Sequence, residues 1–111
     1  MLKIIFHVDE VNRWELTLRN VQNLLSSGES LEIEVLANAA AVRLFTLPDQ
    51  SGTLQDIAKL AQSGVVFAAC KHALAAYQIT QERLPPFVTV VPVGVLELAR
   101  RQTEGYAYIK P

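Results

Sequence analysis

Apolar runs of strand length and helical stripes of apolar residues follow one another along the chain. Residues 2–8 form a mostly apolar run, which is typical of a β-strand covered on both faces. From residue 11 to residue 25, apolar side chains recur every three or four positions, which predicts an amphipathic helix with the stripe Val11, Trp14, Leu18, Val21 and Leu25. Gly28 follows as a residue suited to the left-handed conformation that ends helices.

The same two patterns return in the middle of the chain. Residues 31–35 alternate between apolar and acidic, which predicts a strand with one wetter face, near an edge of its sheet. Residues 39–45 are rich in alanine and predict a short helix. A loop around Pro48 and Gly52 then precedes a helical stripe, which Gly64 ends.

The alternation continues to the C-terminus. Residues 64–70 predict a buried strand that passes directly into a helix. Further strands are predicted at 87–91 and 106–109, on either side of a helix whose packing stripe is Val95, Leu98, Ala99 and Gln102. This order predicts an α/β protein with a mostly parallel five-stranded sheet and helices on both faces. We expect a flavodoxin-like three-layer fold with the strand order 2-1-3-4-5.

Composition limits the classes of function. The 111 residues suffice for one domain, 1–111, with its own core. Half of the residues are apolar, so we expect a homo-oligomer in which part of this surface is covered. Tyr106 and Tyr108 are expected to pack at such an interface. The net charge of −1, with no basic stripe, argues against partners such as nucleic acid or a membrane surface.

Several common features are missing from the sequence. No signal-peptide pattern follows Met1, and no apolar run reaches the roughly 18 residues needed to span a bilayer. A single cysteine cannot form a disulfide within the chain, and metal-ligand spacing is absent, which favours a reducing, cytoplasmic location without a metal. Neither G-x-G-x-x-G nor G-x-x-x-x-G-K-[ST] occurs, so we expect no nucleotide and no cofactor.

Candidate chemistry gathers where the predicted strands end. The carboxyl ends of parallel strands meet at one edge of a sheet, which here combines residues 7–10, 37–38, 70–72 and 92–94. Cys70 is the strongest candidate, because unpaired N–H groups at a helix start favour the thiolate, the form of cysteine that attacks sulfur. The alternative is that Cys70 packs as a small apolar residue.

The residues around the thiol have alternatives of their own. His7 could be a core histidine and His72 a solvated surface residue, or either could assist proton movement. Asn38 could simply cap the helix that follows it. Lys71 adds positive charge, and Gly94 supplies a glycine turn at the same edge.

Taken together and in order, these segments resemble the DsrE/DsrF-like sulfur-relay family, especially its small stand-alone members. The similarity covers essentially the whole chain and rests on residues 4–8 with Trp14, 35–38 with Ala41 and Val42, 64–70, 91–92 with 94–95, and 102–111. The resemblance implies a flavodoxin-like fold, a homotrimer or homohexamer, and a cysteine that carries sulfur as a persulfide. The position of that cysteine corresponds to Cys70.

Two functions are therefore expected. The first is an intracellular sulfur carrier, in which Cys70 takes sulfane sulfur from a donor protein and passes it to an acceptor thiol. Binding or assisting roles then fall to His7, Asn38, Lys71, His72 and Gly94. The second is a non-catalytic oligomeric module that binds a small molecule or a protein, with Cys70 lining the crevice. With one cysteine and no nucleotide motif, neither dithiol exchange within the chain nor nucleotide-dependent chemistry is expected.

Overall fold

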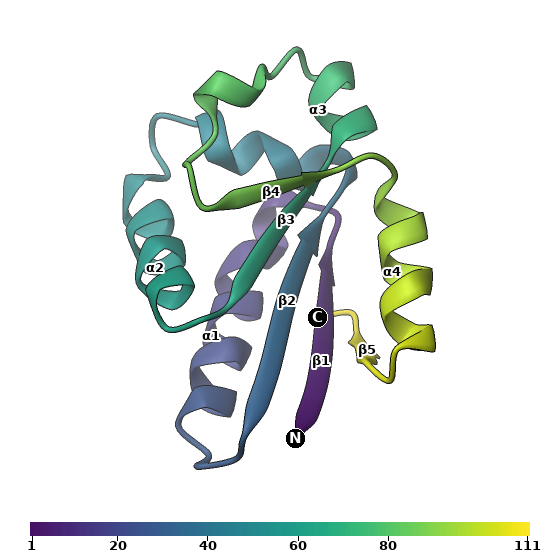
Figure 1. Ribbon diagram of the computed structural model, residues 1–111. Helices are drawn as coiled ribbons and strands as arrows, with labels where there is room; N and C mark the ends of the chain where they lie inside the picture. The colour runs from purple at the N-terminus through teal and green to yellow at the C-terminus, as the bar shows by residue number, and fades with distance from the viewer.

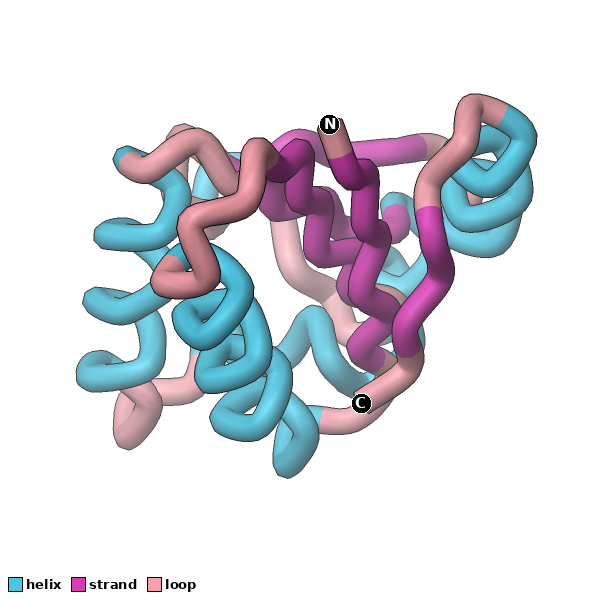
Figure 2. The backbone as a smooth tube through the Cα atoms, turned by 90° about the horizontal axis from the view of Figure 1, so that it is seen from below, coloured by secondary structure: helices cyan, strands magenta, loops and turns pink.

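A computed structural model describes residues 1–111 as a five-stranded parallel sheet between two layers of helices (Figures 1 and 2). The strands are β1 (Leu2–Val8), β2 (Leu31–Ala37), β3 (Val66–Cys70), β4 (Val88–Val91) and β5 (Ala107–Ile109). The α-helices are α1 (Trp14–Leu25), α2 (Ser51–Gln62), α3 (Lys71–Ala76) and α4 (Gly94–Thr103), and the 3-10 turns are η1 (Val11–Arg13), η2 (Ala39–Thr46) and η3 (Gln81–Arg83). The predicted α/β class and parallel sheet are confirmed. None of the helices combines the length and apolar character needed to cross a membrane.

The predicted strand order is wrong. The sheet runs β4-β3-β2-β1-β5 instead of 2-1-3-4-5. From β1 to β4 each crossover steps in the same direction, so right-handed connections keep α1 and α2 on one face. Only α4 crosses the other face, and it returns the chain to β5 beside β1 (Figure 1). The direction of each step depends on which neighbour a strand pairs with, and an alternation of strands and helices does not contain that information.

The two faces of the sheet carry cores of different size. The larger core lies beneath α1 and α2 and contains Trp14, whose indole N–H donates a 2.9 Å hydrogen bond to the carbonyl oxygen of Ala41. The smaller core lies beneath α4 and consists of Ile5, Leu36, Ala68, Val91 and Leu98. The predicted packing stripe of the last helix is wrong in part, because α4 buries Gly94 and Leu98 and leaves Val95 64% exposed. One helix across a wide sheet face can bury only a narrow stripe of its own surface.

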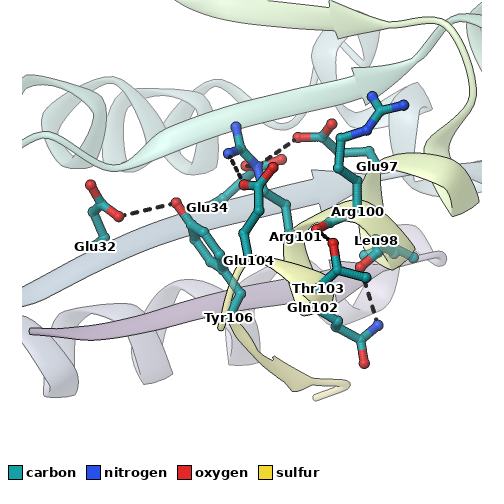
Figure 3. Close-up of polar contacts among 10 residues, drawn as sticks. All are labelled: Glu32, Glu34, Glu97, Leu98, Arg100, Arg101, Gln102, Thr103, Glu104 and Tyr106. Atoms are coloured by element: carbon teal, nitrogen blue, oxygen red, sulfur yellow. Dashed lines mark hydrogen bonds and ion pairs between the residues drawn. The ribbon is translucent and has the colours of Figure 1, made fainter.

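A cluster of charged side chains holds α4 on β2 (Figure 3). Glu34 projects from β2 toward α4 and is only 2% exposed. The Arg101 Nε group donates to Glu34 Oε1 at 2.9 Å and to Glu97 Oε2 at 3.1 Å, and Arg101 Nη1 donates to Glu104 Oε1 at 2.9 Å. The prediction that residues 31–35 lie near a sheet edge is therefore wrong: β2 is the central strand, and the arginine on α4 neutralises part of its acidic face.

The carboxyl group of Glu34 is unusual in its protonation. Its Oε2 atom is buried and has no hydrogen-bond partner. Burial, and after it the carboxyl group of Glu97, raises the pKa of Glu34 to about 8 against the opposing charge of Arg101. Three carboxyl groups around one guanidinium exceed what a single positive charge can balance, so a retained proton on Glu34 lowers the repulsion.

Candidate functional site

Four polar side chains form a row across the carboxyl-terminal half of the sheet. They come from four adjacent strands or their ends: Tyr108 on β5, His7 on β1, Asn38 after β2 and Cys70 at the end of β3. Side chains two residues apart on a strand share a face. The residues two positions earlier on three of these strands, Ile5, Leu36 and Ala68, belong to the core beneath α4. The row therefore lies on the face of the sheet that α4 covers, and Cys70 at its end also packs against the larger core.

Cys70 is the junction residue that the sequence predicted. It is the last residue of β3 and directly precedes α3, and its side chain is buried, with the residue 7% exposed. Its Sγ atom accepts a hydrogen bond at 3.4 Å from the backbone N–H of Gly94, the first residue of α4. The expectation that N–H groups of the helix after Cys70 contact the sulfur is wrong: the Cys70 side chain makes no capping hydrogen bond to α3, and the donor belongs to α4. The positive end of the α4 dipole thus contacts the sulfur.

Gly94 makes this contact possible because it has no side chain. A Cβ atom at position 94 would lie 3.1 Å from Cys70 Cβ, 3.3 Å from Asn38 Cβ and 3.4 Å from Cys70 Sγ. The first two distances are shorter than ordinary contacts between carbon atoms. Glycine therefore lets the start of α4 approach both side chains closely.

His7 links the two ends of the row. Its Nε2 atom lies 2.8 Å from Asn38 Oδ1, and its Nδ1 atom lies 2.7 Å from the hydroxyl oxygen of Tyr108. An amide oxygen only accepts hydrogen bonds, so Nε2 carries a proton and donates it to Asn38. The Tyr108 hydroxyl donates to Nδ1 of the neutral ring, and it can accept from Nδ1 if the ring gains a second proton.

Tyr108 is a site residue that the sequence pattern did not indicate. Its predicted packing against another subunit remains a prediction, and within the chain its hydroxyl group contacts His7. Its spacing in the last strand gave no hint, because β5 was expected at the far end of the sheet from β1. Only the observed pairing of β5 with β1, in which Tyr108 lies opposite Ile5, brings the phenol within reach of the imidazole.

An ion pair lies next to this row. Lys110 Nζ, just after β5, is 3.0 Å from Asp9 Oδ1, just after β1. Hydrogen bonding to Lys110 lowers the pKa of Asp9, and the nearby His7 has the same effect.

Lys71 and His72 occupy the first turn of α3 beside Cys70 in the chain. Both are exposed, and neither makes a side-chain hydrogen bond or an ion pair. Of the predicted site residues, the structure thus brings His7, Asn38 and Gly94 together with Cys70 and leaves the side chains of Lys71 and His72 at the surface. No group of three or more histidine, cysteine or acidic side chains is arranged to hold a metal ion.

Comparisons with known proteins agree with this architecture. A family model described as the DsrE/DsrF-like family matches residues 3–111. The solved structure of protein MTH1491 from Methanobacterium thermoautotrophicum, described as a protein of unknown function, is similar to this chain with a TM-score of 0.90 and 39% sequence identity, and the match covers 100% of both chains. No curated protein matches the chain. The family match spans essentially the whole length of the chain, including the strand that ends at Cys70. The chain belongs to the DsrE/DsrF-like family.

Proposed function

We propose that this protein is a sulfur carrier that holds sulfane sulfur as a persulfide on Cys70. The observation that carries the proposal is the hydrogen bond from the Gly94 N–H to Cys70 Sγ, because a backbone donor at a helix start stabilises negative charge on sulfur. Membership of the DsrE/DsrF-like family supports a role related to sulfur relay. The single thiol supports simple carriage, because no second cysteine could resolve a disulfide.

The transfer consists of two exchange steps without net oxidation. The Cys70 thiolate attacks the outer sulfur of a donor persulfide, the donor S–S bond breaks, and the donor leaves as a thiolate. An acceptor thiolate then attacks the outer sulfur on Cys70, and Cys70 leaves as a thiolate in turn. Donor and acceptor are expected to be other proteins in a reducing compartment such as the cytoplasm, where thiols persist.

The neighbouring residues take different parts in this proposal. Gly94 stabilises the sulfur anion through its N–H group, and His7 accepts or releases a proton at Nδ1 while keeping its bond to Asn38. Lys71 and His72, exposed beside the thiol, are suited to meeting the surface of a donor or acceptor protein. The reaction draws on the chain's own groups, and we propose no bound cofactor.

The burial of Cys70 favours a second candidate function. With the residue only 7% exposed, the thiol could line a crevice that binds a small molecule or a peptide without reacting. The two functions differ in the behaviour of the folded protein. A carrier thiol reacts with a small alkylating reagent at native conditions, whereas a lining thiol reacts only as fast as the protein unfolds.

Mass spectrometry after incubation with a persulfide donor tests the proposal. We expect the intact protein to gain the mass of one sulfur atom, and a reducing agent to remove it. Because Cys70 is the only cysteine, a Cys70→Ser variant is a complete control and should gain nothing. A wild-type protein that stays unmodified, under conditions that load an established carrier with sulfur, would contradict the proposal. It would favour the second candidate function, a binding module.

A further inference from the structure

Asn38 does not do what an asparagine before a helix usually does. It precedes η2, yet its side chain makes no capping hydrogen bond to that helix. Both backbone polar groups of Asn38 are hydrogen-bonded: its N–H donates to the carbonyl oxygen of Val8 at 3.1 Å, and its carbonyl oxygen accepts from the N–H of Ala41 at 3.1 Å. The alternative that Asn38 is simply a helix cap is therefore wrong, and its amide group is available for another purpose.

The amide of Asn38 is held in one orientation. Its Oδ1 atom accepts the 2.8 Å hydrogen bond from His7 Nε2, and His7 is fixed in turn by Tyr108. His7 lies on β1, on one side of β2, and Cys70 lies on β3, on the other side. Because oxygen and nitrogen occupy opposite branches of the amide group, the Nδ2 group is left on the side away from β1.

The sulfur of Cys70 lies on that side. Asn38 Cβ and Cys70 Sγ both come within 3.4 Å of the single point that a Gly94 Cβ would occupy. The Asn38 Nδ2 group donates to no protein atom, although it can donate two hydrogen bonds. Beside a sulfur atom that already accepts from the Gly94 N–H, an oriented amide NH₂ is the natural second donor.

We propose that the Asn38 amide NH₂ and the Gly94 N–H together bind the anionic sulfur on Cys70, and that His7 and Tyr108 are positioning residues that orient the amide. The inference rests on the proposed function for the identity of the bound group, a thiolate or the outer sulfur of a persulfide. The proposal adds the Asn38 amide as a second donor to the sulfur. It also adds the series of hydrogen bonds Tyr108–His7–Asn38, which begins on the last strand, as the support of that amide.

The backbone beside Asn38 agrees with this role. Ala39 has a φ angle of +48°, in the left-handed region that non-glycine residues rarely adopt. Such strain persists where the surrounding structure demands a particular geometry, and functional sites are frequent examples. Here the strained turn starts η2 directly after Asn38 and lets the Asn38 side chain face the row instead of the helix.

The test compares Cys70 reactivity in variants that each alter one side chain among Tyr108, His7 and Asn38 or their surroundings. Asn38→Asp replaces the NH₂ donor with an oxygen, Asn38→Ala removes the amide, and Tyr108→Phe removes only the hydroxyl that orients His7. Tyr106→Phe is the matched control, because the Tyr106 hydroxyl bonds Glu32 away from the row. The readouts are the rate of Cys70 alkylation by iodoacetamide in the folded protein, the retention of a loaded persulfide, and the His7 tautomer by ¹⁵N NMR.

We expect alkylation to slow by about tenfold in Asn38→Ala and more in Asn38→Asp, in line with the loss of one hydrogen bond to a charged group. Tyr108→Phe should cause a smaller loss together with a shift of His7 away from the pure Nε2–H tautomer, and Tyr106→Phe should change neither. A tautomer change would not accompany a merely structural defect elsewhere.

The outcomes separate this inference from the proposed function. If the wild-type protein loads sulfur and Asn38→Ala loads, retains and alkylates equally well, the inference is overturned and the carrier function stands. If the wild-type protein does not load sulfur, the carrier function falls, and the alkylation rates still decide whether the amide binds the thiolate. Should Asn38→Ala fail to fold, the near-isosteric Asn38→Asp and Tyr108→Phe variants provide the same comparison.

Discussion

At position 94 the absence of a single side chain shapes the whole site. Gly94 has an ordinary helical backbone, so its conformation does not require glycine; the space around it does. A Cβ atom there would press against Cys70 at the end of β3 and Asn38 directly after β2. The start of α4 could then no longer donate its N–H to the sulfur at the present distance.

We therefore expect Gly94→Ala to be destabilising by about 1–3 kcal/mol, the usual cost of overpacking a core. It should also slow the alkylation of Cys70, since the N–H group moves away from the sulfur. Chemical denaturation and alkylation kinetics measure the two effects. Gly52→Ala in α2 is the matched control: nothing lies within 4 Å of its added Cβ, so its stability should be unchanged or higher by up to about 1 kcal/mol. Equal behaviour of the two variants would contradict the tight contact.

Individual site residues were only partly predictable from the sequence. Cys70, His7, Asn38 and Gly94 could be nominated because strand ends in a parallel sheet meet at one edge, whatever the strand order. Tyr108 could not, because its contact with His7 depends on β5 pairing with β1. Which N–H group reaches the sulfur was equally hidden, since it depends on the packing of α4.

At the scale of elements, the contact between α4 and β2 is the least ordinary part of the fold (Figure 3). The helix is held by a few buried apolar residues and by Arg101 among three carboxyl groups. The same helix carries Gly94 at its first turn. Arg101, which contacts Glu34, and the N–H donor to Cys70 therefore belong to the same helix.

Glu34→Gln tests the protonation of Glu34 through the pH dependence of stability. The folded protein holds a proton on Glu34 up to about pH 8, whereas the unfolded chain releases it near 4.5, so between these values the folded state binds more protons. The free energy of unfolding of the wild type consequently falls as the pH rises through this range. Glutamine has no such proton, and we expect Glu34→Gln to exceed the wild type near pH 8 by a few kcal/mol, at about 1.4 kcal/mol per pKa unit.

Denaturant titrations across that pH range measure the difference. Glu32→Gln is the control, because Glu32 is an exposed residue on the same strand and the same face, and its variant should follow the wild-type curve. Wild-type and Glu34→Gln curves that run parallel from pH 4.5 to pH 8 would show that Glu34 is ionised in the folded protein and would contradict the retained proton.

Most elements could be read from periodicity, and their neighbours could not. The runs at residues 2–8 and 31–37 became β1 and β2 because strand-length apolar segments have few other ways to bury themselves. The acidic alternation of residues 31–35 was misleading, since it resembles a wet edge when the covering arginine is 67 residues away in the chain. Periodicity reports that one face is polar, and it does not say whether water or a helix covers that face.

At the scale of the whole molecule, the side of the sheet that α4 crosses is incompletely covered. Val66 on β3 is 45% exposed on this side, and Val95 and Leu96 on α4 are 64% and 48% exposed. Exposed aliphatic groups of this size favour association with another copy of the chain. We expect light scattering at micromolar concentration to give a multiple of the monomer mass, as in a trimer or hexamer.

A Val95→Glu/Leu96→Glu double variant should reduce that mass if α4 takes part in the contact, and both positions are exposed enough for the monomer to fold. Leu25→Glu, an exposed leucine at the end of α1 on the opposite face, is the matched control and should leave the mass unchanged. A wild-type protein that is monomeric at all these concentrations would refute the prediction.

The sequence by itself determined the class of this protein: the number and kinds of its elements, the junction at Cys70 and its family. Those properties follow from local patterns, namely the spacing of apolar residues, the residues that end helices and the order of short motifs. The tertiary structure alone decided that β5 returns beside β1, that Tyr108 contacts His7, that α4 supplies the N–H on Cys70 and that Glu34 lies buried beneath Arg101. Each of these joins residues far apart in the chain, and such pairings are selected by the packing of the whole sheet and its helices rather than by any one segment.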